Sequence, residues 1–111
     1  GAKHMDLGQM VDAVKHKSTK KVELEVDDLK QFRQALQTRA DIILLDNMSV
    51  AQTRRAVQMR RQAGSKVLLE ASGGIDLKHV RQYAAAGVDR ISIGSLTHSR
   101  QAVDISLEFQ P

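Results

Sequence analysis

Four short runs of aliphatic residues recur along the chain at roughly regular intervals. They cover residues 22–26, 42–46, 67–70 and 91–93, and each is rich in Val, Ile or Leu. Their length and β-branched content are typical of buried strands. The segments between them have helical periodicity, so strand and helix alternate along the chain. This alternation predicts a parallel sheet with right-handed crossovers.

The segments between the strands carry apolar stripes at the spacing of a helix. The stripes consist of Leu29, Phe32 and Leu36, of Val50 and Val57 with neighbouring alanines, and of Leu77, Val80 and Ala84. A further helix is expected ahead of the first strand, over residues 7–16. Each stripe would pack against the sheet, which gives four βα units and one leading helix.

Capping residues mark where these helices begin and end. The expected starts are at Asp27 or Asp28, at Ser49 with Gln52 three residues later, and at Asp76. Gly64 and Gly87 fall where two of the helices should stop. Residues 34–43 and 82–91 also echo each other, because in both a helix end is followed by a small residue, an aspartate and a strand. A repeated βα unit explains this echo without common descent of the units.

The tail alternates apolar and polar residues over residues 103–109. Strict alternation predicts a half-buried strand. Such a strand needs a sheet to join, and the sequence offers no obvious partner for it.

Acidic residues and glycine-rich loops gather where the predicted strands end. Glu25, Asp46 and Glu70 lie at the ends of the first three runs, and Gly/Ser loops follow the third and fourth runs at residues 72–74 and 94–95. Function in parallel βα folds sits at this carboxyl rim. The loops precede helices, so their N–H groups suit a phosphate. The carboxylates suit ribose hydroxyls, Mg²⁺ or a developing positive charge.

Several of these features have simpler structural explanations. Asp27 and Asp28 are more often helix caps than ligands, residues 72–74 can form a plain tight turn, and His98 alone is more often a surface residue. The basic pairs at residues 54–55 and 60–61 are typical of a solvated helix face. Glu25 and Asp46 are harder to explain structurally, because an aliphatic residue is preferred at the end of a buried strand.

Composition narrows the class of protein. The chain has 111 residues, too few for a complete (β/α)8 barrel, which usually needs about 250 residues. The formal charge of +4 suits phosphorylated small molecules or nucleic acid, but only 3% of residues are aromatic, which argues against stacking on single strands. Without cysteine or a long apolar run, the chain is expected to be cytoplasmic with no membrane partner. Residues 1–5 lack the apolar core of a signal peptide. Whether these residues belong to the natural chain or were added to it is left open.

Five segments, taken together and in order, resemble a known family. They are residues 22–27, 40–47, 69–74, 87–99 and 104–107, within a nearly continuous match from about residue 21 to residue 109. This part of the chain is similar to the C-terminal half of the barrel of quinolinate phosphoribosyltransferase, the carboxylating nicotinate-nucleotide pyrophosphorylase. Any one segment alone would be a weak signal, and the specificity comes from their order and spacing.

The resemblance implies an activity and a set of site residues. The family joins quinolinate to phosphoribosyl pyrophosphate with Mg²⁺, and forms nicotinate mononucleotide, CO2 and pyrophosphate for NAD synthesis. Glu25 and Asp46 correspond to its acidic residues beside the ribose and Mg²⁺, as catalytic and metal-binding groups. The residues that correspond to its phosphate-binding part are Ser72, Gly73, Gly74, Ser92, Gly94 and His98, and Lys3 corresponds to its active-site lysine.

The departures from the family define what this chain can be. The N-terminal half, with the arginines that bind quinolinate, has no counterpart here, and neither has the sandwich domain that receives the last strand. Arg39 stands where the family has a helix-ending glycine. We therefore expect one domain over residues 1–111, folded as a parallel (βα)4 half-barrel, with a flavodoxin-like three-layer sandwich as the alternative. It is expected to be a homodimer that binds phosphoribosyl groups without full turnover. A non-catalytic, self-associating scaffold is the alternative function.

Overall fold

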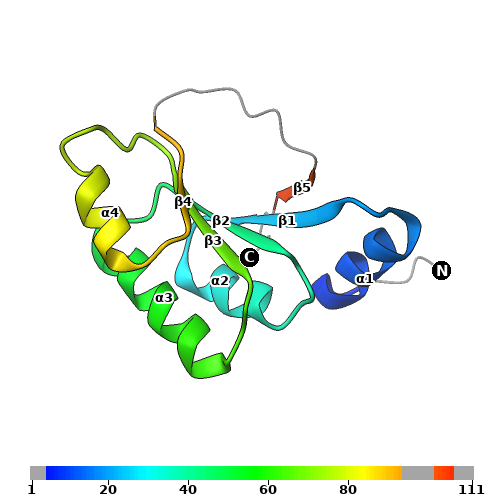
Figure 1. Cartoon of the computed structure of the whole chain (residues 1–111). Coiled ribbons are helices and arrows are strands. Elements are labelled where there is room, and N and C mark those ends of the chain that lie inside the picture. The colour runs from blue at the N-terminus through cyan, green and yellow to red at the C-terminus, as the bar shows by residue number, and fades with distance from the viewer. Residues whose placement is uncertain (1–4, 94–101, 107–111) are drawn as a thin grey trace.

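The computed structural model describes residues 5–93 and the backbone of residues 102–106. Helices and strands alternate in the predicted order (Figure 1). The elements are α1 (Leu7–Lys17), β1 (Lys21–Val26), α2 (Leu29–Leu36), β2 (Ile42–Asp46), α3 (Val50–Ala63), β3 (Leu68–Ser72), α4 (Val80–Ala86), β4 (Arg90–Ile91) and β5 (Ala102–Ser106). None of the helices in this described part is long and apolar enough to cross a membrane.

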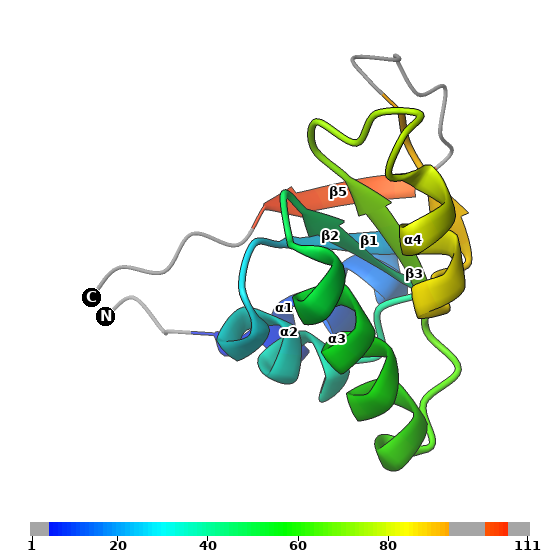
Figure 2. The ribbon, with the colours of Figure 1, turned by 90° about the vertical axis from the view of Figure 1, so that its left-hand side faces the viewer.

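The strands form a single parallel sheet in the order β4-β3-β2-β1-β5. The four helices lie on the same face of this sheet (Figure 2). A βα barrel has this arrangement, because its helices all lie outside the sheet. The predicted half-barrel is therefore confirmed, and the flavodoxin-like alternative, which needs helices on both faces, is not adopted.

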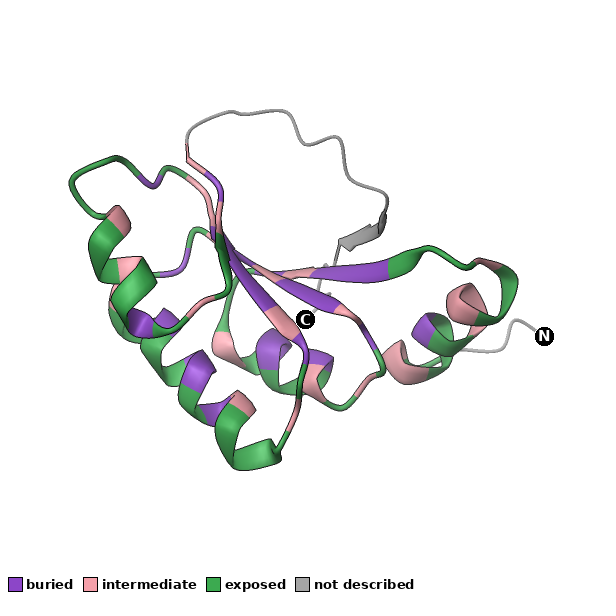
Figure 3. Cartoon of the chain, viewed as in Figure 1, coloured by how far each residue is buried: buried purple, intermediate pink, exposed green. Residues whose placement is uncertain are grey.

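The core lies between the sheet and the helices (Figure 3). Every second side chain of each strand packs into this core, because successive side chains of a strand point to opposite faces of the sheet. One continuous buried cluster includes Val22, Leu24 and Val26 of β1, Ile43 and Leu45 of β2, Leu69 of β3, Val11 of α1, Phe32 and Ala35 of α2, and Ala56, Val57 and Met59 of α3. The residues between them on the strands, which include Glu25, Asp46 and Glu70, belong to the opposite face.

The tail strand has a partner that the sequence did not reveal. β5 pairs in parallel with β1, from Lys21 with Ala102 to Glu25 with Ser106. The expectation that the chain offers no obvious partner for its tail was therefore wrong. The reason is that the outer edge of β1 leaves a row of backbone N–H and C=O groups, which can accept another strand. Residues 107–109 of the predicted strand lie outside the described residues.

The last βα unit differs most from prediction. α4 begins at Val80 rather than at Asp76, whose carboxylate accepts from the His79 amide at 3.1 Å and caps the preceding turn. The stripe predicted to face the core was also wrong, because Leu77 is 76% exposed. α4 lies at the open end of the sheet and packs mainly on α3, where the Tyr83 hydroxyl donates to the Met48 carbonyl at 2.7 Å. β4 is shorter than predicted, ending at Ile91.

The other helix ends follow the capping chemistry of the sequence. Asp28 caps α2, and Ser49 and Gln52 form a reciprocal capping box at the start of α3. Gly64 and Gly87 end α3 and α4 in the left-handed conformation. α2 has no such glycine, and the Thr38 hydroxyl instead donates to the Ala35 carbonyl at 2.7 Å.

Two aspartates fasten neighbouring strands at the amino-terminal end of the sheet. Asp41 accepts from the Val22 amide at 2.8 Å and pairs with Lys15 of α1 at 3.0 Å. Asp89 accepts from the Leu69 amide at 2.9 Å and pairs with Arg60 of α3. These are the two aspartates of the echoed segments. The repeat in the sequence thus corresponds to the same fastening in two βα units.

The Asp41 fastening predicts a pH-dependent stability. Burial raises the pKa of Asp41, but the Val22 amide and the Lys15 ammonium outweigh it, so the pKa lies below 3.8, the ordinary value. Because the folded-state pKa is lowered, the ionised Asp41 carboxylate stabilises the fold fully above pH 3.8. This stabilisation is lost as the pH falls through the lower pKa of the folded state. Asp41→Asn should lower the free energy of unfolding by about 1–2 kcal/mol at neutral pH. Urea unfolding of both chains at several pH values should show this difference shrinking in acid.

The matched control is Asp12→Asn. Asp12 and Arg39 form an exposed pair 3.6 Å apart, so its loss should change stability by less than about 0.5 kcal/mol. A difference between wild type and Asp41→Asn that stays constant with pH would contradict the role given to Asp41.

Substitution of Gly87 should destabilise the fold more than substitution of Gly64, the other glycine that ends a helix. A Cβ atom at Gly87 would lie 2.9 Å from a methyl of Val57, whereas one at Gly64 would meet nothing within 4 Å. Both residues have positive φ, so alanine at either should cost about 1 kcal/mol for the left-handed backbone. Gly87→Ala should cost about 1–3 kcal/mol more from overpacking. Equal losses for the two variants in chemical unfolding would refute the close contact with Val57.

Candidate functional site at the carboxyl rim of the sheet

Three of the predicted site residues stand on adjacent strands at the carboxyl rim. The parallel register aligns Asp46 at the end of β2 with Ser72 at the end of β3. Glu25 of β1 is level with Leu44 of β2. Leu44 comes two residues before Asp46 and therefore lies on the same face of the sheet as Asp46. Glu25, Asp46 and Ser72 alternate with core residues, so they share the sheet face away from the helices. The structure therefore brings the two predicted acids and the start of the glycine loop together.

Gly73 packs directly against the end of β2. Its φ is +92°, and a Cβ atom there would lie 2.6 Å from the Asn47 nitrogen and 2.9 Å from Oδ1 of Asp46. The Asn47 amide also donates to the Ser72 carbonyl at 2.8 Å. Asn47 itself has a positive φ of 56°, as the tight turn after β2 requires. The Asp46 carboxylate is thereby held against the backbone of the predicted phosphate loop.

Gly74 differs from Gly73 in what surrounds it. It also has a positive φ, of 69°, but a Cβ atom there would meet nothing within 4 Å. The loop of residues 72–74 is thus closely packed on its Asp46 side and open beside Gly74. An open backbone with positive φ is the kind of place where a ligand can approach main-chain groups closely.

Two further acids lie on the same face of the sheet, away from the helices, but farther from the rim. Glu23 and Glu70 are each only 3% exposed, and Glu70 accepts a hydrogen bond of 2.7 Å from the Ser92 hydroxyl. Glu70 was predicted to lie at the rim, whereas Glu23 was not among the predicted site residues. The signal for Glu23 was present, because it alternates with Glu25 on one strand among core valines and leucines. Lys3, Gly94 and His98, also predicted for the site, lie outside the described residues.

The described residues do not form a metal site from protein side chains alone. No three His, Cys, Asp or Glu side chains there are grouped so that they could hold a metal ion. Glu25 and Asp46 offer two carboxylates from adjacent strands. Mg²⁺ is commonly held by one or two carboxylates together with substrate phosphates, so this donor set suits an ion that arrives with a phosphorylated substrate.

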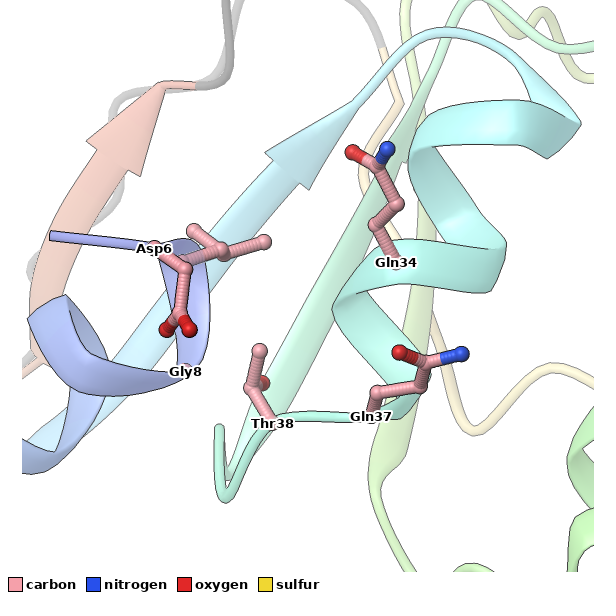
Figure 4. Close-up of a pocket in the computed structure, with 6 residues that line it drawn as sticks. Asp6, Gly8, Gln34, Gln37 and Thr38 are labelled. Atoms are coloured by element: carbon pink, nitrogen blue, oxygen red, sulfur yellow. The ribbon is translucent and has the colours of Figure 1, made fainter. Parts of the chain in front are cut away.

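Two hollows of the described part lie away from the rim. One, of about 390 Å³, lies between the start of α1 and the end of α2 and is lined by Asp6, Leu7, Gly8, Gln34, Gln37 and Thr38 (Figure 4). The other, of about 360 Å³, lies between α2 and α3, and its lining includes Arg33, Arg55 and Met59. Neither contains a predicted site residue. The carboxyl rim is therefore not the wall of either of these two hollows.

The contact between Gly73 and Asp46 can be tested by substitution. Gly73→Ala should lower the free energy of unfolding by about 2 kcal/mol or more, because the new methyl meets backbone atoms and the left-handed φ is strained. It should also shift the amide resonances of Asp46 and Asn47. Gly74→Ala carries the backbone strain alone, at about 1 kcal/mol, and should leave those resonances in place. Similar spectra for the two variants would contradict the packing of this loop.

Comparison with known proteins identifies the family to which this rim belongs. A family model described as the quinolinate phosphoribosyl transferase C-terminal domain matches residues 3–108. The chain is 45% identical over 95 residues to a probable nicotinate-nucleotide pyrophosphorylase (carboxylating) of Methanocaldococcus jannaschii, covering 82% of this chain and 34% of that protein. It is 42% identical over 107 residues to the corresponding protein of Mycobacterium leprae, covering 93% and 38%.

Solved structures agree with the sequence comparisons. The nicotinate-nucleotide pyrophosphorylase of Francisella tularensis superposes with a TM-score of 0.69 at 38% identity, covering 88% of this chain and 34% of that one. That of Ehrlichia chaffeensis gives 0.65 at 35% identity, covering 91% and 37%. The chain thus spans little more than a third of the length of these relatives. Its fold, its ordered motifs and these matches together show that it belongs to the quinolinate phosphoribosyl transferase family, of which it holds the C-terminal domain.

Proposed function

We propose that this chain supplies the phosphoribosyl-binding rim of a carboxylating nicotinate-nucleotide pyrophosphorylase. The observation that carries the proposal is the packing of Gly73 against Asp46, which joins an acidic strand end to a glycine loop. A phosphoribosyl group needs both, because its ribose offers hydroxyls to carboxylates and its phosphate needs N–H donors. The relatives that match most of this chain are named for the same activity.

The reaction gives each part of the rim a task. Quinolinate and phosphoribosyl pyrophosphate would yield nicotinate mononucleotide, pyrophosphate and CO2. As pyrophosphate leaves, positive charge develops on the ribose, and fixed carboxylates stabilise it electrostatically. Glu25 and Asp46 lie on adjacent strands of the face away from the helices, where they can flank a ribose held by the neighbouring loop. Mg²⁺, when bound with the substrate, would neutralise pyrophosphate charge, and Glu25 and Asp46 are the residues that would hold it.

The 5-phosphate would lie at the loop after β3. Ser72, Gly73 and Gly74 form its near side, and the open flank at Gly74 leaves backbone accessible to a ligand. The resemblance adds Gly94, His98 and Lys3 to this site. α4 is short and begins several residues beyond the loop, so the loop backbone, rather than the end of a long helix, is the feature proposed to bind phosphate.

Full turnover requires more than this chain. It covers about a third of its relatives' length, and the family's quinolinate-binding arginines belong to the part not represented here. Catalysis depends on holding both reactants in line. We therefore expect binding of phosphoribosyl pyrophosphate without formation of nicotinate mononucleotide by this chain alone.

Calorimetric titration tests this proposal. Phosphoribosyl pyrophosphate with Mg²⁺ should bind the purified chain saturably, and Asp46→Asn should raise the Kd about tenfold or more, since a charge-assisted contact is lost. Asp6→Asn is the matched control, because Asp6 caps α1 at a distance from the rim and asparagine also caps well. No saturable binding at millimolar ligand, or an equal effect of both variants, would refute the proposed site.

A second candidate function is a self-associating scaffold without a ligand. It is favoured by the open end of the sheet, where β4 has two residues and Leu77 beside α4 is 76% exposed. An open strand edge with apolar neighbours invites another chain. This scaffold, like the homodimer and the cytoplasmic location expected from the sequence, remains a proposal. Light scattering that gives a dimer mass, together with a failed titration, would favour it over the phosphoribosyl site.

A further inference from the structure

Glu70 and Ser92 form a buried pair directly below the proposed phosphate loop. The Ser92 hydroxyl donates to Oε2 of Glu70 at 2.7 Å, and the two residues are 8% and 3% exposed. Glu70 lies on β3 two residues before Ser72, and Ser92 follows the last residue of β4. The hydrogen bond therefore crosses between the two strand ends that carry the predicted phosphate-binding segments.

The hydrogen-bond donors of Ser92 are both engaged within the sheet. Its backbone N–H donates to the Ala71 carbonyl at 2.9 Å, and its hydroxyl proton goes to Glu70. A serine has only these two donors. A phosphate at neutral pH chiefly accepts hydrogen bonds, so Ser92 could donate to it only by giving up one of these contacts. This geometry favours a role for Ser92 other than the direct phosphate binding predicted from the resemblance.

We propose that Glu70 and Ser92 are positioning residues for the loop of residues 72–74, an inference that rests on the proposed phosphoribosyl site. By tying the end of β4 to β3, the pair fixes the strand from which the loop departs. Hydrogen bonds to a carboxylate are stronger than neutral ones, and burial strengthens them further. The pair thus sets the place at which Ser72, Gly73 and the Asp46 carboxylate meet the ligand.

Two roles for Ser92 predict opposite effects of removing the Glu70 carboxylate. If Ser92 donated to phosphate, Glu70 would compete for its proton, and Glu70→Met would release the hydroxyl and strengthen binding. If the pair positions the loop, Glu70→Met removes the tie and weakens binding. Methionine keeps a long unbranched side chain that adapts to a buried site. Glu70→Gln, which retains an acceptor, should lie between wild type and Glu70→Met.

The test is a double-mutant cycle with ribose 5-phosphate and Mg²⁺ as the probe. Glu70→Met and Ser92→Ala should each raise the Kd about tenfold, and the double variant should bind no more than about twofold more weakly than either single variant. In the absence of ligand, all three variants should shift the amide resonances of Gly73 and Gly74 and leave that of Gly64 unchanged. Ser92→Thr, which keeps the hydroxyl, should restore both binding and spectra.

The outcomes separate this inference from the proposed function. Stronger binding by Glu70→Met, additive effects in the cycle, or unshifted amides of Gly73 and Gly74 would each overturn the positioning role. If wild type fails to bind ribose 5-phosphate, the proposed function falls, and the amide shifts still decide whether the pair holds the loop. Weakened, non-additive binding with shifted loop amides is the result expected.

Discussion

The parallel pairing of β2 with β3 is the contact on which the rest of the molecule depends. Its register aligns Asp46 with Ser72 and brings the turn at Asn47 against Gly73. Because side chains alternate along a strand, the same register sends Ile43, Leu45 and Leu69 into the core. A shift of one residue would exchange these two faces. Packing of the core therefore fixes the geometry of the rim.

The two ends of the sheet carry different kinds of residue. At the amino-terminal end, Asp41 and Asp89 join neighbouring strands to basic residues of α1 and α3. At the carboxyl end, acids and glycines stand where the strands stop. This separation matches the division seen in βα barrels between a stabilising and a functional end. It leaves the carboxylates at the rim available for the proposed ligand, because the contacts of Asp41 and Asp89 stabilise the opposite end of the sheet.

Residue patterns predicted the elements that local chemistry determines. The strand at residues 42–46, the caps at Asp28 and Ser49 and the stops at Gly64 and Gly87 follow from spacing and side-chain type. The exposure of Leu77 and the pairing of β5 with β1 could not be predicted from local residue patterns. Both depend on what lies at the edge of the sheet. Glu25, Asp46 and Ser72 were predicted to share a rim from strand ends alone. The contact of Gly73 with Asp46 and the hydrogen bond from Ser92 to Glu70 needed the register.

The pairing of β5 with β1 has a consequence for any larger assembly that contains this chain. One edge of a strand can hold a single partner, so β5 and an incoming strand must compete for β1. A chain with β5 in place is sealed at that end and open at β4. Completion of a barrel through β1 would first require the tail to be displaced. The tail thus acts as an internal competitor, and its release from β1 would have to precede closure of such a barrel.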